Sequence, residues 1–165
     1  MSSFNLFETD SLEKIVSSSL NGCDDGELYI EDNTSESFLF DDNVLKNTTY
    51  NEFKGFGLRG VKDDLIGYAH SSDLSVNAIK EASNTVASIK KGYQGIKSID
   101  PLMTNSLLYT DKNPIDGIEF SKKVKLLEDI NSYARDLDNR VRQLSVNLSG
   151  SWQKINILKP SGQKL

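Results

Sequence analysis

The segment from Glu27 to Ser71 alternates short β-rich stretches with acidic turns, and this pattern limits the possible folds more than any other feature of the chain. Five stretches have the composition of strands: residues 28–30, 38–40, 44–51, 56–59 and 65–69. The turns at Asp41-Asp42-Asn43 and Lys62-Asp63-Asp64 are too short for the crossover of a dozen or more residues that joins parallel strands. The segment therefore predicts an antiparallel β-meander.

Three further stretches carry apolar residues at the spacing of one helix face, and such helices would cover the apolar face of the meander. Their expected caps are Thr9 or Ser11, Asp73 or Ser75, and Ser121. The three apolar stripes are Leu12, Ile15, Val16 and Leu20; Val76, Ile79, Ala82, Val86 and Ile89; and Val124, Leu127, Ile130, Ala134, Leu137 and Val141. Two strand-like runs follow the last helix, at residues 144–148 and 152–158, with Ser149-Gly150 between them.

The predicted fold is α+β: an antiparallel β-meander with helices packed on one face, followed by a truncated helix-plus-strands segment. The turn at Pro160-Ser161-Gly162 follows a strand, and native sheets avoid the unpaired edge this would leave, so we expect a piece of a longer protein. A polar tail after a complete fold is the alternative. We place one domain over residues 1–100, and a linker with the truncated start of a second, middle domain over residues 101–165.

The charge balance argues against nucleic-acid binding. The chain has 24 acidic and 19 basic residues and a formal net charge of −5, whereas duplex binding relies on clustered Lys and Arg. No run approaches the roughly 20 apolar residues of a membrane span, and the first ten residues lack the pattern of a secretory signal. Cys23 is the single cysteine, which excludes an internal disulfide and fits a reducing compartment. We therefore expect a cytoplasmic protein with no nucleic-acid or membrane partner.

The sequence Gly55-Phe56-Gly57-Leu58-Arg59-Gly60 has the Gly-x-Gly-x-x-Gly pattern, but a dinucleotide site with this pattern needs a helix to open on it. Here the glycines lie in a strand pattern, where they more often mark a close backbone approach or a bulge. A zinc site or a catalytic triad is not expected either, because His70 and Cys23 are the only residues of their kinds. The acid pairs Asp24-Asp25, Asp41-Asp42 and Asp63-Asp64 fall at predicted turns and are interpreted as solvated turns.

Arg59 stands out because it is a cation on a glycine-rich strand in a mostly apolar stretch. We expect it to pair with an acid or to face an interface, with a structural ion pair as the default. Gly55, Gly57 and Arg59 are therefore the candidate structural or interface residues, and no residue is given a catalytic, cofactor-binding or metal-binding role. The large aromatic residues expected in the core are Phe38, Phe40, Phe56 and Trp152.

A set of short motifs spread over nearly the whole chain points to a family. The motifs are Gly26-Glu27-Leu28-Tyr29, Glu36-Ser37-Phe38, Leu45-Lys46-Asn47, Gly55-Phe56-Gly57-Leu58-Arg59, Gly67-Tyr68-Ala69, Leu108-Tyr109-Thr110 with Asn113-Pro114, Tyr133-Ala134-Arg135 and Leu148-Ser149-Gly150. Together they resemble the N-terminal part of the TldD/PmbA family, also named modulators of DNA gyrase and regarded as metallopeptidases. The resemblance is closest to the TldD branch.

The resemblance implies a parent metalloprotease whose zinc-binding His-Glu-x-x-x-His motif lies in a later region, so zinc is expected there and no cofactor in this chain. It also implies a TldD/PmbA-family partner subunit, in a homo- or heterodimer that encloses a chamber for peptide or unfolded substrates. This chain would then be a non-catalytic portion that contributes to dimer assembly and substrate access. One alternative is a stand-alone binding module, from a split or degraded gene, that docks on such a partner. Another is an unrelated small α+β adaptor, which would gain support if the strands after Val141 completed the first sheet.

Overall fold

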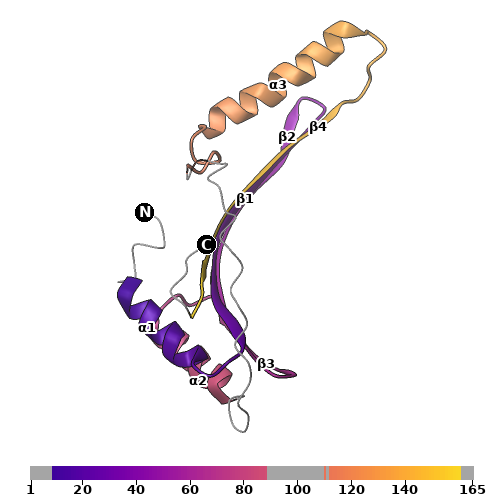
Figure 1. The fold of residues 1–165 in the computed structure, drawn as a ribbon. Helices are drawn as coiled ribbons and strands as arrows, with labels where there is room; N and C mark the ends of the chain where they lie inside the picture. Colours follow the sequence, from indigo (N-terminus) through magenta and orange to yellow (C-terminus); the bar gives the residue numbers. More distant parts are fainter. Residues whose placement is uncertain (1–8, 89–109, 111, 161–165) are drawn as a thin grey trace. The chain divides into compact units, whose positions relative to one another are not determined.

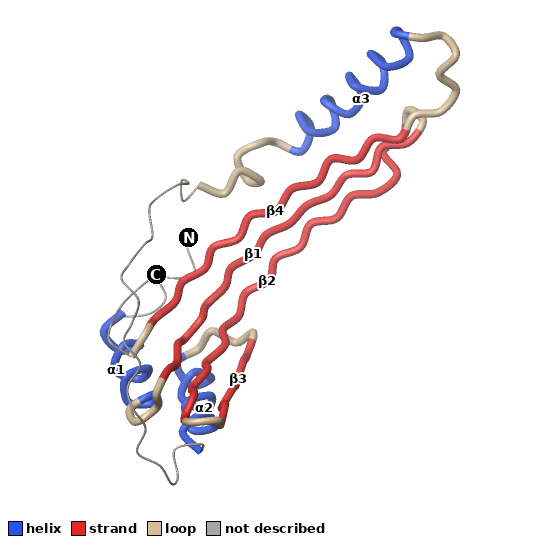
Figure 2. Tube along the Cα trace, turned by 45° about the vertical axis from the view of Figure 1, so that its right-hand side comes forward, coloured by secondary structure: helices blue, strands red, loops and turns tan. Residues whose placement is uncertain are grey.

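The computed structural model describes residues 9–88, 110 and 112–160. Its elements in chain order are α1 (Thr9–Leu20), β1 (Asp25–Asp41), β2 (Val44–Lys62), β3 (Leu65–Ser71), α2 (Val76–Ala87), α3 (Phe120–Leu137) and β4 (Ser145–Leu158) (Figure 1). The strands form one sheet in the order β3-β2-β1-β4 (Figure 2). β1, β2 and β3 are thus a meander of consecutive strands, and the predicted α+β class is confirmed.

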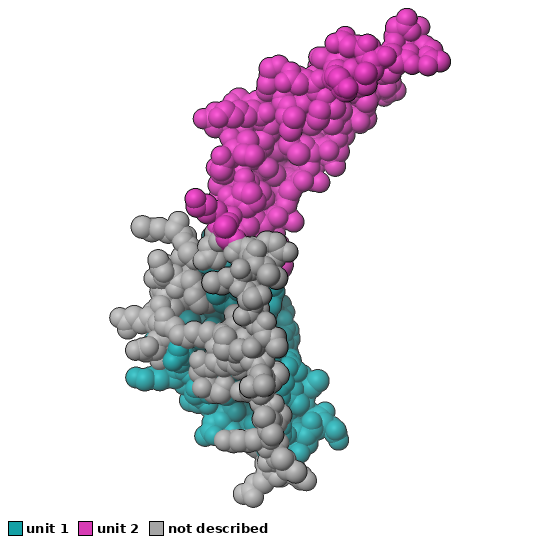
Figure 3. Space-filling model, turned by 45° about the horizontal axis from the view of Figure 1, so that its top comes forward, with its two compact units in different colours: residues 1–32, 53–109, 154–165 teal, residues 33–52, 110–153 magenta. Residues whose placement is uncertain are grey.

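The chain divides into two compact units, each built from separate stretches of sequence (Figure 3). Unit 1 contains residues 1–32, 53–109 and 154–165, and unit 2 contains residues 33–52 and 110–153. β1, β2 and β4 each give part of their length to unit 1 and the rest to unit 2. Neither unit is therefore one continuous piece of the chain.

Unit 1 buries an apolar core between α1, α2 and one face of its strands. Alternate strand residues point to the same side, so Leu28 and Ile30 of β1 enter the core together, as do Phe56 and Leu58 of β2. The helices add the apolar stripes that their sequences predict. The buried core consists of Leu12, Val16, Leu20, Leu28, Ile30, Phe56, Leu58, Ile79, Ala82, Val86 and Leu158.

Unit 2 has a smaller apolar cluster and a buried ion pair. Lys123 of α3, whose side chain is 8% exposed, donates to Glu36 of β1 at 2.6 Å and to the carbonyl oxygen of Ile115 at 2.8 Å. The apolar cluster consists of buried Phe38, Phe40 and Leu127, with partly buried Leu45, Val124, Val146 and Leu148 around them. Both apolar and ionic contacts therefore hold α3 to the strands.

The strands are fewer and longer than the sequence predicts. The predicted break at Asp32-Asn33 lies inside β1, the predicted gap before Phe56 lies inside β2, and Ser149-Gly150 lies inside β4. The breaks in β1 and β2 were wrong because polar residues at these positions pair across the two strands. Asp32, for example, forms an ion pair with Lys54 of β2 at 3.4 Å.

The predicted helices are present, but one cap was wrong. Ser75 is the N-cap of α2, as predicted, and its hydroxyl accepts a hydrogen bond from the Ala78 amide at 3.2 Å. α3 instead begins at Phe120, with Glu119 in the N-cap position and no side-chain capping bond. The predicted Ser121 cap was wrong because the N-cap position lies two residues earlier, which puts Ser121 inside the helix.

Other predictions have mixed outcomes. Ile89 and the domain boundary near residue 100 lie outside the described residues, so the boundary stays a prediction. Val141 lies beyond the end of α3. β4 pairs with β1, so the chain after Val141 does complete the first sheet. Among the helices that the structure describes, none has the length and apolar character needed to cross a bilayer.

Candidate functional site

Gly55, Gly57 and Arg59 lie at alternate positions of β2, so they share one face of the strand. Phe56 and Leu58, between them, point into the core of unit 1 and are at most 4% exposed. The three residues therefore belong to the opposite face of the unit 1 sheet, which we call the open face.

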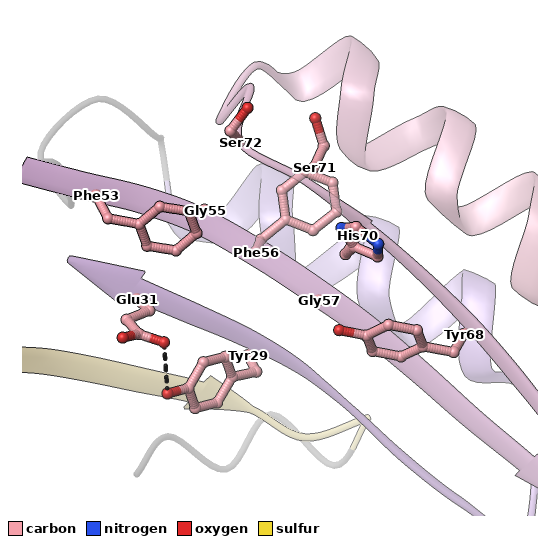
Figure 4. Close-up of a pocket in the computed structure, with 10 residues that line it drawn as sticks. All are labelled: Tyr29, Glu31, Phe53, Gly55, Phe56, Gly57, Tyr68, His70, Ser71 and Ser72. Carbon is pink, nitrogen blue, oxygen red and sulfur yellow. Dashed lines mark hydrogen bonds between the residues drawn. The ribbon is translucent and has the colours of Figure 1, made fainter. Parts of the chain in front are cut away.

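A groove of about 640 Å³ lies on the open face (Figure 4). Gly55 and Gly57 contribute no side chains to fill it, so they leave room between the aromatic residues on either side. The groove is lined by Tyr29 and Glu31 of β1, by Phe53, Gly55, Phe56 and Gly57 of β2, and by Tyr68, His70, Ser71 and Ser72 of β3 and the residue after it.

Neighbouring groups approach both glycines closely. A Cβ at Gly57 would lie 2.9 Å from the Tyr68 hydroxyl oxygen, and a Cβ at Gly55 would lie 3.0 Å from the Ser71 carbonyl oxygen and 3.4 Å from the Phe53 ring. A side chain at Gly57 would therefore have to displace the Tyr68 ring. Strand glycines commonly stand at such close approaches.

Aromatic and hydroxyl groups make up the walls of the groove. Phe53 and Tyr68 are each 58% exposed, and the Tyr68 and His70 rings have centroids 5.7 Å apart. Tyr29 donates a hydrogen bond to Glu31 at 3.0 Å. Burial raises the pKa of Tyr29, and the bond to the Glu31 carboxylate raises it further. The groove therefore presents neutral aromatic surface with hydrogen-bonding groups at its edges.

Four charged side chains form a cluster in the same unit, which we call the Arg59 cluster. Arg59 donates to Glu27 from Nε at 2.6 Å and from Nη2 at 2.9 Å, and from Nη2 to Asp25 at 2.9 Å. Lys159, just after β4, donates to Asp25 at 3.1 Å and to Glu27 at 3.4 Å. Two cations and two anions thus neutralise one another.

The members of the Arg59 cluster stabilise one another's charged forms. The hydrogen bond from Arg59 lowers the pKa of Glu27 against the effect of burial. Burial raises the pKa of Asp25, but bonds from Lys159 and the Gly26 amide and the nearby cations outweigh it and bring the pKa below its usual value. The bond to Glu27 raises the pKa of Arg59. Burial lowers the pKa of Lys159, but both carboxylates outweigh it and raise the pKa.

The open face offers aromatic contact surface. The part of the chain that the structure describes contains no group of three or more His, Cys, Asp or Glu side chains that could hold a metal ion. His70 lies exposed on β3 opposite Gly57, within the groove. Exposed aromatic rings beside an arginine resemble the centre of a protein interface in composition.

The remaining sequence candidates have structural positions. A Cβ at Gly60 would lie 2.7 Å from Val86, so this glycine lets α2 pack closely on β2. All three motif glycines lie within β2, which leads to β3 and not to a helix. Asp41-Asp42 and Asp63-Asp64 adjoin the turns on either side of β2, as predicted. The interpretation of Asp24-Asp25 as a solvated turn was wrong, because Asp25 begins β1 and joins the Arg59 cluster, and Asp24 forms an ion pair with Lys62 at 3.6 Å.

Sequence reasoning missed Tyr29, Phe53 and Tyr68 as groove residues. They are far apart in the sequence and meet only through strand pairing, which sets Tyr68 opposite Arg59. The alternation of Gly55 and Gly57 in β2 was the available signal, because residues without side chains allow neighbouring rings to lie against that face of the strand. Of the four aromatic residues predicted in the core, three are buried: Phe38, Phe40 and Phe56. The fourth, Trp152, is partly buried.

Comparisons of sequence identify relatives over most of the chain. Residues 26–90 match the domain described as PmbA/TldA metallopeptidase domain 1. The metalloprotease TldD homolog of Buchnera aphidicola subsp. Schizaphis graminum is 30% identical over 141 residues, and that of Haemophilus influenzae is 26% identical over 143 residues. Each alignment covers 84% of this chain but only 29% and 30% of the relatives, respectively. The chain thus spans less than a third of the length of these curated relatives.

Two solved structures share the fold. TldE from Thermococcus kodakarensis has a TM-score of 0.66 at 18% identity, and a putative modulator of a DNA gyrase from Thermotoga maritima has a TM-score of 0.68 at 16% identity. Each match covers 94% of this chain and 36% of the other. The unrelated-adaptor alternative is therefore wrong, although β4 completes the first sheet. The matched domain, the TldD relatives and the shared fold together show that this chain belongs to the TldD/PmbA family, as an N-terminal part of it.

Proposed function

We propose that this chain is the non-catalytic N-terminal portion of a TldD-like zinc metalloprotease and contributes to dimer assembly and substrate access in peptide proteolysis. The exposed aromatic groove over Gly55 and Gly57 carries the proposal, because aromatic rings left 58% exposed beside an open groove are typical of interface centres. The zinc would be held by residues outside this chain. The partner would be a TldD/PmbA-family subunit, in a homo- or heterodimer in the cytoplasm.

The Arg59 cluster supports an interface at this face. Its side chains are 16–37% exposed and already paired, so a partner that covered them would leave no charge without a counter-charge. Gly55 and Gly57 let the Phe53 and Tyr68 rings lie close to β2, so a partner would meet those rings above the buried glycines. We therefore assign Arg59 to the border of the interface and the glycines to its floor.

The first test measures the metal content and peptidase activity of the purified chain of 165 residues. We expect elemental analysis to find no stoichiometric, tightly bound zinc, and we expect unfolded and short peptides to remain uncleaved. Stoichiometric zinc together with hydrolysis would overturn the non-catalytic role.

The second test measures the affinity of the chain for a full-length TldD/PmbA-family subunit by isothermal titration calorimetry. The double variant Phe53→Ala and Tyr68→Ala is expected to bind on the order of tenfold more weakly or worse, because it removes two aromatic anchors. Tyr50→Ala is the matched control, since Tyr50 is 51% exposed but belongs to unit 2. An unchanged affinity of the double variant would exclude the groove.

The stand-alone binding module remains the alternative proposal, because the chain covers under a third of its relatives. It would use the same groove to dock on a family subunit. Immunoblotting of source-cell lysate separates the two proposals. A band far above 18.4 kDa favours a portion of a peptidase, whereas a band at 18.4 kDa favours the module.

A further inference from the structure

The groove on the open face differs in composition from the apolar core of the same unit. Four of its ten lining residues are Phe or Tyr, and none is Val, Leu, Ile or Met. The unit 1 core is aliphatic apart from Phe56. Contacts that stay permanently buried resemble such a core, whereas aromatic residues are enriched where separate proteins meet. The lining therefore suits a segment of another polypeptide better than a permanently packed part of the same chain.

Two aromatic side chains leave surface for stacking in the groove. The end of Tyr68 lies over Gly57, where a Cβ would lie between 2.9 and 3.3 Å from three Tyr68 atoms. Phe53 lies beside Gly55, where a Cβ would lie 3.4 and 3.7 Å from two atoms of its ring (Figure 4). Both Phe53 and Tyr68 stay 58% exposed. Grooves lined by such rings are the feature that binds proline-rich segments in several peptide-recognition domains.

Two polar groups of the groove are available to donate hydrogen bonds. Within the part of the chain that the structure describes, the Tyr68 hydroxyl and the His70 ring form no hydrogen bond, and each can donate one. Glu31, the carboxylate in the lining, already accepts a hydrogen bond from Tyr29 at 3.0 Å. An occupant must therefore supply acceptors, and the paired carboxylate gives it no reason to carry a charge.

A proline-rich segment offers this combination of groups. Proline has no backbone N–H, and the polyproline II helix leaves its carbonyl oxygens free of internal hydrogen bonds. Its pyrrolidine rings present apolar surface to aromatic side chains. A β-strand would instead need free backbone groups at a sheet edge, but at Gly57 β2 already pairs with β3. The groove volume of about 640 Å³ lies within the roughly 300–1,000 Å³ that is usual for ligand sites.

We propose that the groove holds a proline-rich segment of the partner subunit in the polyproline II conformation. The prolines stack on Phe53 and Tyr68, and the carbonyl oxygens of the segment accept hydrogen bonds from the Tyr68 hydroxyl and the His70 ring. The inference rests on the proposed function, in which the groove contacts a TldD/PmbA-family subunit, and it names the chemistry of the segment that enters the groove.

Fluorescence anisotropy of a labelled decaproline peptide titrated with the purified chain tests the proposal. We expect saturable binding. A labelled decapeptide of alternating leucine and serine is expected to bind on the order of tenfold more weakly or worse, because its backbone N–H groups find no free carboxylate in the groove. Decaproline that does not bind, or a leucine–serine peptide that binds as tightly, overturns the proposal. The second result would identify the groove as a packing surface for an aliphatic segment.

Variants of the chain locate the bound peptide. The double variant Phe53→Ala and Tyr68→Ala is expected to raise the Kd for decaproline on the order of tenfold or more. Tyr68→Phe keeps the ring and removes one donor, so it should raise the Kd roughly two- to tenfold. Tyr50→Ala, which changes an exposed tyrosine of unit 2, is the matched control with an unchanged Kd. If the double variant binds decaproline as tightly as the unchanged chain, the proposal is overturned.

Competition separates this inference from the proposed function. Excess decaproline is expected to displace a full-length TldD/PmbA-family subunit from the chain. If the double variant weakens subunit binding but decaproline neither binds nor competes, the inference fails and the proposed function stands. If decaproline binds without displacing the subunit, the segment does not come from the partner and the inference fails on its source. A subunit that does not bind the chain at all overturns the proposed function and, with it, this inference.

Discussion

Unit 1 and unit 2 both set helices on strands, but different forces hold those helices in place. In unit 1, α1, α2 and the strands share a core of eleven buried residues. In unit 2, the apolar cluster contains three buried residues, and α3 is also held by the Lys123–Glu36 ion pair. Apolar contacts depend on area and have no preferred direction, whereas a buried ion pair needs both partners. The comparison indicates that the position of α3 depends on a single polar residue, whereas the buried ion pair of unit 1, Lys62–Asp24 at 3.6 Å, joins β2 to the residue before β1.

The largest expected effect is that of Lys123→Ala. It should destabilise unit 2 by about 3–5 kcal/mol, because Glu36 stays buried without its cation. Trp152, the single tryptophan and a member of unit 2, reports this as a shift of its fluorescence transition in urea. Lys125→Ala is the control with little expected change, since its pair with Asp129 is 67% and 60% exposed. If the two substitutions destabilise unit 2 equally, the buried Lys123–Glu36 ion pair does not hold α3 as proposed.

Leu58→Ala should come next, with a loss of about 2–5 kcal/mol from the cavity it leaves in the unit 1 core. Leu58 has no exposed surface, whereas the control Leu65→Ala removes a side chain that is 57% exposed. Circular dichroism during urea unfolding measures the loss. If the Trp152 fluorescence transition shifts by the same amount, the two units unfold together. The two units would then differ in their contacts but not in their free energies of unfolding.

Ser75→Ala should cost about 1 kcal/mol through loss of the α2 cap. Ser121→Ala should cost less, because Ser121 lies inside α3 and Glu119 holds the N-cap position. Thermal unfolding of the two variants checks this order. The reverse order would mean that α3 starts where the sequence pattern placed it.

The smallest expected effect concerns the pH dependence of the Arg59 cluster. Asp25 and Glu27 have pKa values below their usual 3.8 and 4.5, so their stabilising contribution is present above those values and is lost as the pH falls through the lowered ones. Arg59→Gln should therefore lower the melting temperature slightly near neutral pH, and the difference from the unchanged chain should shrink in acid. A difference that grows in acid would contradict the assigned charges.

The sequence predicted the helices and the meander because their patterns are local. The apolar stripe of α2 and the Ser75 cap lie within a few residues of each other, so they could be read directly. Strand length could not be read from the sequence, because polar residues such as Asp32 and Glu36 look like parts of a loop until their partners on other elements are known. The groove was missed for the same reason: strand pairing, not sequence distance, brings Tyr29 and Phe53 together.

The interleaving of the units has a consequence for how such a chain can be inherited. Unit 2 consists of residues 33–52, which lengthen the β1–β2 hairpin, and residues 110–153, which bring α3 and most of β4. A deletion or a recombination at one place in the gene would alter only one of these stretches, leaving α3 without Phe38 and Phe40 or those rings without α3. Two coordinated changes are needed to gain or lose unit 2 intact. Exchange between genes should therefore move both units together.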